Sequence, residues 1–214
     1  MATRRTLTDP AIRPLAADTW EAFERLAEKH NGVWGGCWCT WFHPQRDELA
    51  KGSGAAGTHD LKKRLVAEGL AHAALVFDGD AAVAWCEYGP PGELTRLYHR
   101  KEVEREDYRP PDWRITCFFV DRDYRRSGVS RVALQGALDL IAAAGGGVVE
   151  SYPQDPASAA KVAPSFLYNG TRGMFEDAGF VFERHKGNGK NCVVRRNVAA
   201  SASGVSPLRR DTGH

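Results

Sequence analysis

A basic turn in the middle of the chain carries the residues best suited to bind an anion, in the order Arg125, Arg126, Ser127, Gly128, Val129, Ser130. Residues 115–120 before it are β-branched, aromatic and apolar, which is typical of a buried strand. Residues 129–144 after it repeat apolar positions at the spacing of a helix packed on a sheet. The first amides of a helix lack internal partners, and Gly128 lets a ligand approach the backbone closely. Strand, turn and helix therefore predict a phosphate-binding site.

Two glutamates are candidates for acid–base chemistry. Glu87 and Glu150 lie near the ends of two further strand-like segments, next to apolar residues. Partial burial there would raise a carboxyl pKa, which favours a general base; a surface glutamate is the alternative for each. Strand alternation places Glu87 on the same face as Trp85. Cys117 lies in a buried-looking strand without a visible His partner, which favours a core thiol over a nucleophile.

Residues 33–44 have the most unusual composition in the chain, with three Trp, two Cys, one Phe and one His. Cys37, Cys39 and His43 suggest metal binding, but the second ligand pair of a structural zinc site is missing, so no metal is predicted. The aromatic rings either pin a loop to the core or line a pocket.

The bulk properties narrow the class of protein. A chain of 214 residues with 43% hydrophobic composition predicts one domain over residues 1–198, followed by a tail, 199–214, of disordered composition. A net charge of +2 does not favour a nucleic-acid partner. No apolar run approaches the roughly 20 residues that span a membrane. The first residues do not have the pattern expected of a secretory signal. Five cysteines suit a reducing cytoplasm, where we expect the protein.

Periodicity and turn residues predict the elements that position these side chains. Strands are expected over residues 11–15, 71–77, 81–88, 115–120, 148–152, 180–185 and 192–198. Helices are expected over residues 20–30, 58–68, 129–144 and 166–178.

The central turn resembles motif A of the GCN5-related N-acetyltransferases, the GNAT superfamily. In that motif an Arg or Gln is followed by Gly three positions later and by a small residue two further on, here Arg125, Gly128 and Ser130. The element order over residues 11–198 resembles the family layout as well. The resemblance implies an α/β fold of the α+β kind, with a mixed, mostly antiparallel central sheet and helices on both faces.

The resemblance also implies an activity, the transfer of an acetyl group from acetyl-coenzyme A to a primary amine of a small molecule or protein. The amine would attack the thioester directly in a ternary complex. The backbone of Phe118 and Val120 would pair with the pantetheine arm, and the Val120 amide would donate to the thioester oxygen. The pyrophosphate would lie on the turn, at Arg125, Arg126, Ser127, Gly128, Val129 and Ser130. The segment after the first helix commonly lines the acceptor pocket in this fold, which implies substrate binding by Trp34, Trp38 and Trp41.

The second family motif departs from the pattern. Aligning Gly179 and Phe180 with its Gly-Phe pair puts Phe175 where the family has the Tyr that protonates the leaving thiolate. Tyr168 then takes the Asn position and is expected at the cofactor, about 10 Å from Phe175 by helical rise. Tyr152 is the candidate substitute acid, with solvent as the alternative.

The missing Tyr leaves a second reading open, a catalytically silent domain that binds or senses acyl-coenzyme A. Dimers are common in the family, and the C-terminal hairpin could serve a homodimer.

Overall fold

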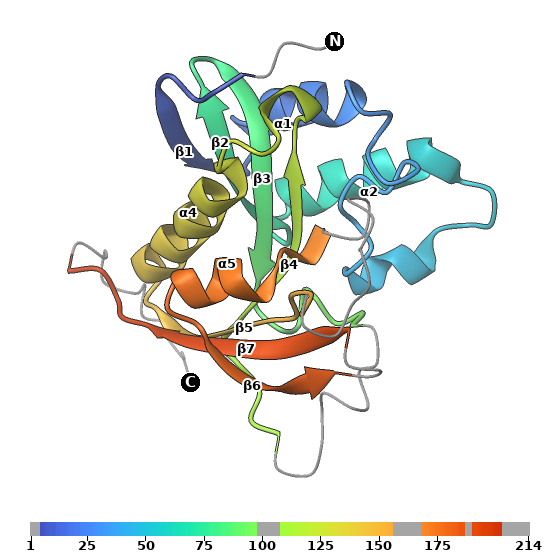
Figure 1. The fold of residues 1–214 in the computed structure, drawn as a ribbon. Helices are drawn as coiled ribbons and strands as arrows, with labels where there is room; N and C mark the ends of the chain where they lie inside the picture. The colour runs from blue at the N-terminus through green and yellow to red at the C-terminus, as the bar shows by residue number, and fades with distance from the viewer. Residues whose placement is uncertain (1–4, 98–107, 156–167, 187–189, 203–214) are drawn as a thin grey trace, which may run out of the picture.

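The computed structural model describes residues 5–97, 108–155, 168–186 and 190–202. Its described residues form a seven-stranded sheet in the order β1-β2-β3-β4-β5-β7-β6 (Figure 1). The strands are β1 Pro10–Pro14, β2 His72–Asp78, β3 Ala81–Gly89, β4 Trp113–Val120, β5 Gly147–Ser151, β6 Val181–Lys186 and β7 Asn191–Val198. The α-helices are α1 Trp20–Glu28, α2 Gly54–Ala67, α4 Val129–Ala143 and α5 Arg172–Asp177, with short 3-10 turns at Pro44–Glu48 and Arg122–Tyr124.

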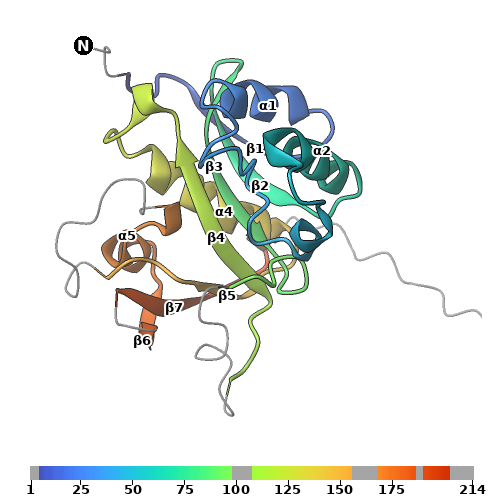
Figure 2. The same ribbon diagram turned by 90° about the vertical axis from the view of Figure 1, so that its right-hand side faces the viewer.

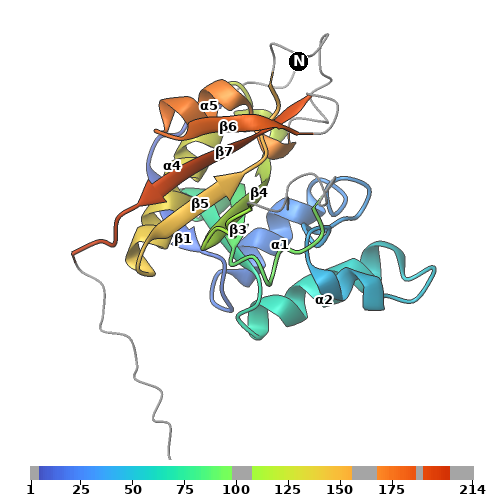
Figure 3. The same cartoon turned by 90° about the horizontal axis from the view of Figure 1, so that it is seen from below.

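The sheet is mixed and mostly antiparallel, as predicted. The β4–β5 pair is parallel, and the other five pairs are antiparallel. Helices α1 and α2 lie on one face and α4 and α5 on the other (Figures 2 and 3). The central strands are therefore buried on both faces, which explains their nearly continuous apolar sequences.

Strand β3 shows how one strand serves two cores. Trp85 packs with α1 and α2, while Ala84 and Cys86 pack with α4 and α5. Successive side chains of a strand point to opposite faces, so each face receives its own apolar cluster.

Two helices differ from their predictions. Helix α2 begins at Gly54 instead of residue 58, and the helix before β6 is much shorter than expected. Residues 166–178 were expected to be helical throughout, but α5 begins only at Arg172. Thr171 is extended, at φ −115° and ψ 150°, and its side chain accepts a hydrogen bond from the Met174 amide. This N-cap competes with helix formation before it. Residues 166 and 167 of the expected helix, and residues 203–214 of the expected tail, lie outside the described residues.

No α-helix in the described part of the chain is long and apolar enough to cross a membrane.

Candidate functional site

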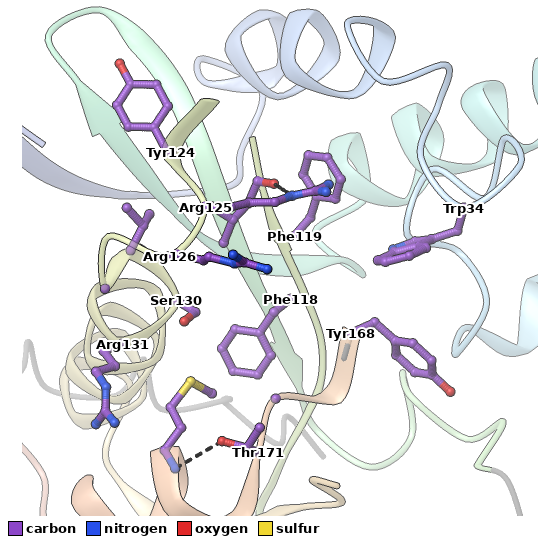
Figure 4. Close-up of a pocket in the computed structure, with 15 residues that line it drawn as sticks. Trp34, Phe118, Phe119, Tyr124, Arg125, Arg126, Ser130, Arg131, Tyr168 and Thr171 are labelled. Atoms are coloured by element: carbon purple, nitrogen blue, oxygen red, sulfur yellow. Dashed lines mark hydrogen bonds between the residues drawn. The ribbon is translucent and has the colours of Figure 1, made fainter. Parts of the chain in front are cut away.

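A cavity of about 500 Å³ opens where the N-terminus of α4, the second half of β4 and the segment before α5 meet (Figure 4). Its volume lies within the range of small-molecule sites. It is lined by Trp34, Phe118, Phe119, Val120, Tyr124, Arg125, Arg126, Gly128, Val129, Ser130, Arg131, Tyr168, Gly170, Thr171 and Met174. Eight of the nine residues predicted to bind the cofactor are in this set. The ninth, Ser127, does not line the cavity, and its hydroxyl donates to the Tyr124 carbonyl.

The basic turn supplies the polar end of the cavity. Gly128 is the N-cap of α4 and has a left-handed backbone, at φ 83°. A Cβ placed there would meet no atom within 4 Å, so the space above it is open. The first amides of α4 follow at Val129 and Ser130, and the helix dipole favours an anion at this end.

Contacts from two other elements hold the segment that leads into this turn, at Asp121, Asp123 and Tyr124. Lys29, just after α1, pairs with Asp121 at 2.7 Å and with Asp123 at 2.8 Å. Asp78, at the end of β2, accepts a hydrogen bond from the Tyr124 hydroxyl at 2.9 Å. The end of β4 that leads into the basic turn is therefore anchored to both α1 and β2.

Strand β4 contains a β-bulge next to the cavity. Glu87 lies opposite Cys117, but Tyr88 lies opposite Ile115, so Thr116 is an extra residue. Thr116 and Cys117 consequently both face α1 and α2: Thr116 Oγ1 donates to Glu87 at 2.8 Å, and Cys117 belongs to the core on that face.

The bulge reverses the direction in which the β4 backbone groups point. Before it, the Ile115 carbonyl faces β5 and accepts from the Ser151 hydroxyl at 2.8 Å. After it, the Asp121 amide donates to Val83 on the β3 side at 2.8 Å. Alternation then directs the amides of Phe118 and Val120 away from β3.

Strand β5 does not follow β4 along this part of its length. The pairing of the two strands ends at Ile115 with Ser151, whereas β4 continues to Val120. Among the described residues no strand pairs with β4 beyond Ile115, so Phe118 and Val120 lie along an open strand edge that leads to the basic turn. The Val120 carbonyl on this edge accepts from Arg125 Nε at 3.2 Å. An extended ligand chain can pair with such an edge as an added strand would.

Glu87 does not lie in the environment that the sequence suggested. It is fully buried, with Lys62 Nζ at 3.1 Å, His43 Nε2 at 3.4 Å and the Thr116 hydroxyl at 2.8 Å. Burial alone would raise the pKa of Glu87, but the charge of Lys62 and the contacts from His43 and Thr116 lower it to about 2. The expectation of a raised pKa is therefore wrong, because it did not include the lysine.

Tyr152 is buried at the end of β5 and does not line the cavity. Its hydroxyl donates to Glu150, which also accepts from Tyr108 at 3.0 Å and pairs with Arg195 at 2.5 Å. Burial raises the pKa of Tyr152 well above its ordinary value. Tyr152, the candidate acid, and Glu150, a candidate base, are therefore hydrogen-bonded to each other outside the cavity.

The three tryptophans expected to bind the acceptor have different surroundings. Trp34 lines the cavity and is 40% exposed. Trp38 is buried against Phe23 and His59 between α1 and α2. Trp41 packs under the Arg96 guanidinium, 4.6 Å from its ring centroid, and does not line the cavity.

Cys37 and Cys39 are not placed as metal ligands. Cys39 Sγ accepts a hydrogen bond from Trp85 Nε1 at 3.3 Å, and burial raises the pKa of its thiol. Within the described residues, no group of three or more His, Cys, Asp or Glu side chains could hold a metal ion.

Sequence reasoning missed several residues around the cavity. Phe119, Tyr124, Gly170, Thr171 and Met174 line it, and Lys62 is the buried partner of Glu87. Gly170 was treated as a weakness in a helix, although its left-handed φ of 71° fits the turn before the Thr171 N-cap. The Asn-Gly-Thr sequence at 169–171 was the available signal for that turn.

No protein-family model matches the sequence, and no curated protein sequence matches it. Solved structures do resemble the fold. A Corynebacterium glutamicum structure described as "histone acetyltransferase HPA2 and related acetyltransferase" aligns with a TM-score of 0.52 and 14% identity, over 91% of this chain and 99% of that one. Ribosomal-protein-S18-alanine N-acetyltransferase from Escherichia coli aligns with a TM-score of 0.46 and 11% identity, over 92% and 99%. The chain has the α/β fold of the GNAT acetyltransferases.

Proposed function

We propose that the protein is an acetyl-coenzyme-A-dependent N-acetyltransferase, acting on a primary amine of a small molecule or a protein. The observation that carries the proposal is the cavity in which a helix N-terminus and an open strand edge meet. The first suits a pyrophosphate, and the second suits the amide groups of a pantetheine arm. The fold supports the same activity, because structures with this fold include acetyltransferases.

In the proposed complex the pyrophosphate lies on the amides of Gly128, Val129 and Ser130. Arg125 and Arg126 add positive charge at the same end of the cavity. Coenzyme A carries three negatively charged phosphate groups, so two arginines at this end of the cavity favour its binding. Added salt screens this attraction.

The pantetheine arm then runs along β4 from the turn. Val120 is the residue of the open edge nearest the turn, and Phe118 lies about 7 Å further along the strand. The thioester is at the end of the arm farthest from the pyrophosphate. We therefore place the amide of Phe118, rather than that of Val120, beside the thioester oxygen.

The reaction is a direct substitution at the thioester carbon. The neutral amine nitrogen attacks the carbonyl, and the negative charge that develops on its oxygen is stabilised by the Phe118 amide. The C–N bond forms, the C–S bond breaks, and the coenzyme leaves as a thiolate. A thiol pKa near 8.5 makes this a tolerable leaving group, so water can supply its proton and accept the proton lost by the amine.

A specific observation favours a second function, acyl-coenzyme-A binding without transfer. Phe175 occupies the position of the family's Tyr, is fully buried, and packs edge-on against Phe118 at 5.9 Å. It has no hydroxyl, so this position supplies no acid.

Calorimetric titration with acetyl-coenzyme A tests the proposal. The wild type should bind with micromolar affinity, and Gly128→Trp should abolish binding by filling the open space at the turn. Gly79→Trp is the matched control, because Gly79 is also left-handed, at φ 60°, and its Cβ also meets open space, in the β2–β3 turn. Amine-dependent thiol release then separates the enzyme from the silent binding domain. No binding by the wild type would exclude both functions.

A further inference from the structure

We infer that the acceptor is a primary alkylamine whose chain ends in a planar aromatic ring, and that this ring lies against Trp34, Phe119 and Tyr168. The inference rests on the proposed function and deepens it by naming the class of acceptor. These three side chains form the aromatic end of the cavity.

The cavity has two chemically different ends. Figure 4 shows Arg126, Ser130 and Arg131 near the start of α4, and Trp34 and Tyr168 on the opposite side. Phe118, whose amide we place beside the thioester, lies between the two ends (Figure 4). A coenzyme whose phosphates lie at the basic end therefore directs its acetyl group toward the aromatic end, where the acceptor must approach.

The aromatic end is built from rings that stand edge to face. The Trp34 ring lies 6.4 Å from Phe119 at an interplanar angle of 87°, and 6.1 Å from Tyr168 at 65°. Phe119 is itself stacked on the buried Trp85 at 4.7 Å, which fixes its position. Trp34 nevertheless remains 40% exposed, so it offers a ring surface to a ligand. Ring pairs of this kind favour a planar aromatic partner over a puckered aliphatic one.

An unusual backbone holds Trp34 in this place. Six consecutive residues, 31–36, have positive φ, among them Val33 at 49° and Trp34 at 45°. L-residues rarely adopt this conformation in succession, and a β-branched residue such as Val33 is an outlier there. The Val33 side chain is buried, and its carbonyl accepts from the amides of Gly36 at 2.9 Å and Cys37 at 2.8 Å. Strain that the surrounding contacts maintain is characteristic of ligand-binding segments.

The test compares two amines that differ in ring planarity. 2-Phenylethylamine and 2-cyclohexylethylamine have the same chain length and a similar apolar ring, so thiol release from acetyl-coenzyme A isolates the aromatic contribution. We expect kcat/KM to be about fivefold to tenfold higher for the phenyl compound in the wild type. Trp34→Leu should remove this preference, and Trp34→Phe should keep most of it. A peptide with an N-terminal phenylalanine is assayed in parallel. It carries the same ring, so the comparison shows whether the acceptor is a small-molecule amine or the N-terminus of a polypeptide.

The control is Val181→Ala, which shortens another exposed apolar side chain, on β6 and outside the cavity. It should retain the wild-type preference. Equal kcat/KM for the two amines, a preference that survives in Trp34→Leu, or acetylation of alkylamines alone would overturn the inference. If no ring-bearing amine is acetylated although acetyl-coenzyme A binds, the acceptor class is wrong while the coenzyme site stands. If acetyl-coenzyme A does not bind, the proposed function itself fails.

Discussion

Lys62 and Glu87 form an ion pair of 3.1 Å in the interior, and neither side chain is exposed to solvent. The pair joins α2 to β3, and the second carboxylate oxygen of Glu87 accepts from Thr116 at the β4 bulge. Buried charges are costly unless they are paired and hydrogen-bonded, as both are here. Together with Thr116, the pair therefore connects α2, which lies outside the cavity, to β4, the strand whose amides face it.

Thr116→Val should weaken the proposed binding of acetyl-coenzyme A without affecting the basic turn. Losing the hydrogen bond to Glu87 loosens the bulge that directs the Phe118 and Val120 amides toward the open edge. We expect Kd for acetyl-coenzyme A to rise about threefold to tenfold, the equivalent of one hydrogen bond, by calorimetry. Binding of ADP, which lacks the pantetheine arm, should not change, and Thr116→Ser should restore the wild-type value. Equal losses for both ligands would show that the bulge does not act on the arm selectively.

The Lys62–Glu87 pair predicts loss of stability in acid. The folded-state pKa of Glu87 is about 2, against an ordinary value of 4.5. Its contribution is thus fully present above pH 4.5 and is lost as pH falls toward 2, because the unfolded chain binds the proton first. The difference is on the order of 3 kcal/mol at neutral pH.

Urea unfolding between pH 7 and pH 3 measures this contribution. The double variant Lys62→Met/Glu87→Gln removes both charges and should lose less stability than the wild type over that range. Lys62→Met alone leaves the carboxylate unpaired and should cost about 3–5 kcal/mol at pH 7. Parallel pH profiles for the wild type and the double variant would contradict this account of the pair.

Tyr152→Phe should leave the rate of acetyl transfer within about twofold of the wild type, because the hydroxyl donates to Glu150 outside the cavity. Stability should fall by about 1 kcal/mol, since Glu150 keeps Tyr108 and Arg195 as partners. Tyr108→Phe removes the other phenol from the same carboxylate and is the matched control. A roughly hundredfold loss of kcat specific to Tyr152→Phe would instead identify this residue as the acid.

Substitution of Asn31 tests the strained segment, residues 31–36, at a position that does not line the cavity. Its φ is 54°, which Gly adopts freely and Ala adopts at a cost. Asn31→Ala should lower the free energy of unfolding by about 1 kcal/mol, whereas Asn31→Gly should be neutral or stabilising. Denaturant titration checks both changes. Equal effects of Ala and Gly would show that residue 31 does not carry left-handed strain in solution.

Local pattern in the sequence determined most of the elements and the basic turn at the start of α4. Apolar residues alternate or recur along the strands and helices, and the turn has Gly128 between a buried strand and an amphipathic helix. Each of these features depends on neighbours within one or two turns of chain. Seven strands and a mostly antiparallel sheet could therefore be predicted, and eight of the nine residues expected at the cofactor line the cavity.

The tertiary structure decided the ionisation of Glu87, the surroundings of Tyr152 and the direction of the β4 amides. Lys62 lies 25 residues before Glu87, and Arg195 lies 45 residues after Glu150. Local sequence pattern therefore predicts neither ion pair. The bulge is a property of the register between β3 and β4, which neither strand encodes alone. The left-handed run that presents Trp34 depends likewise on a buried Val33 and on Gly32, whose Cβ would clash with the Trp38 ring. Charge pairing and strand register arise between segments that are distant in the sequence, and the strain at residues 31–36 depends on the burial of Val33, which is why only the folded chain reveals them.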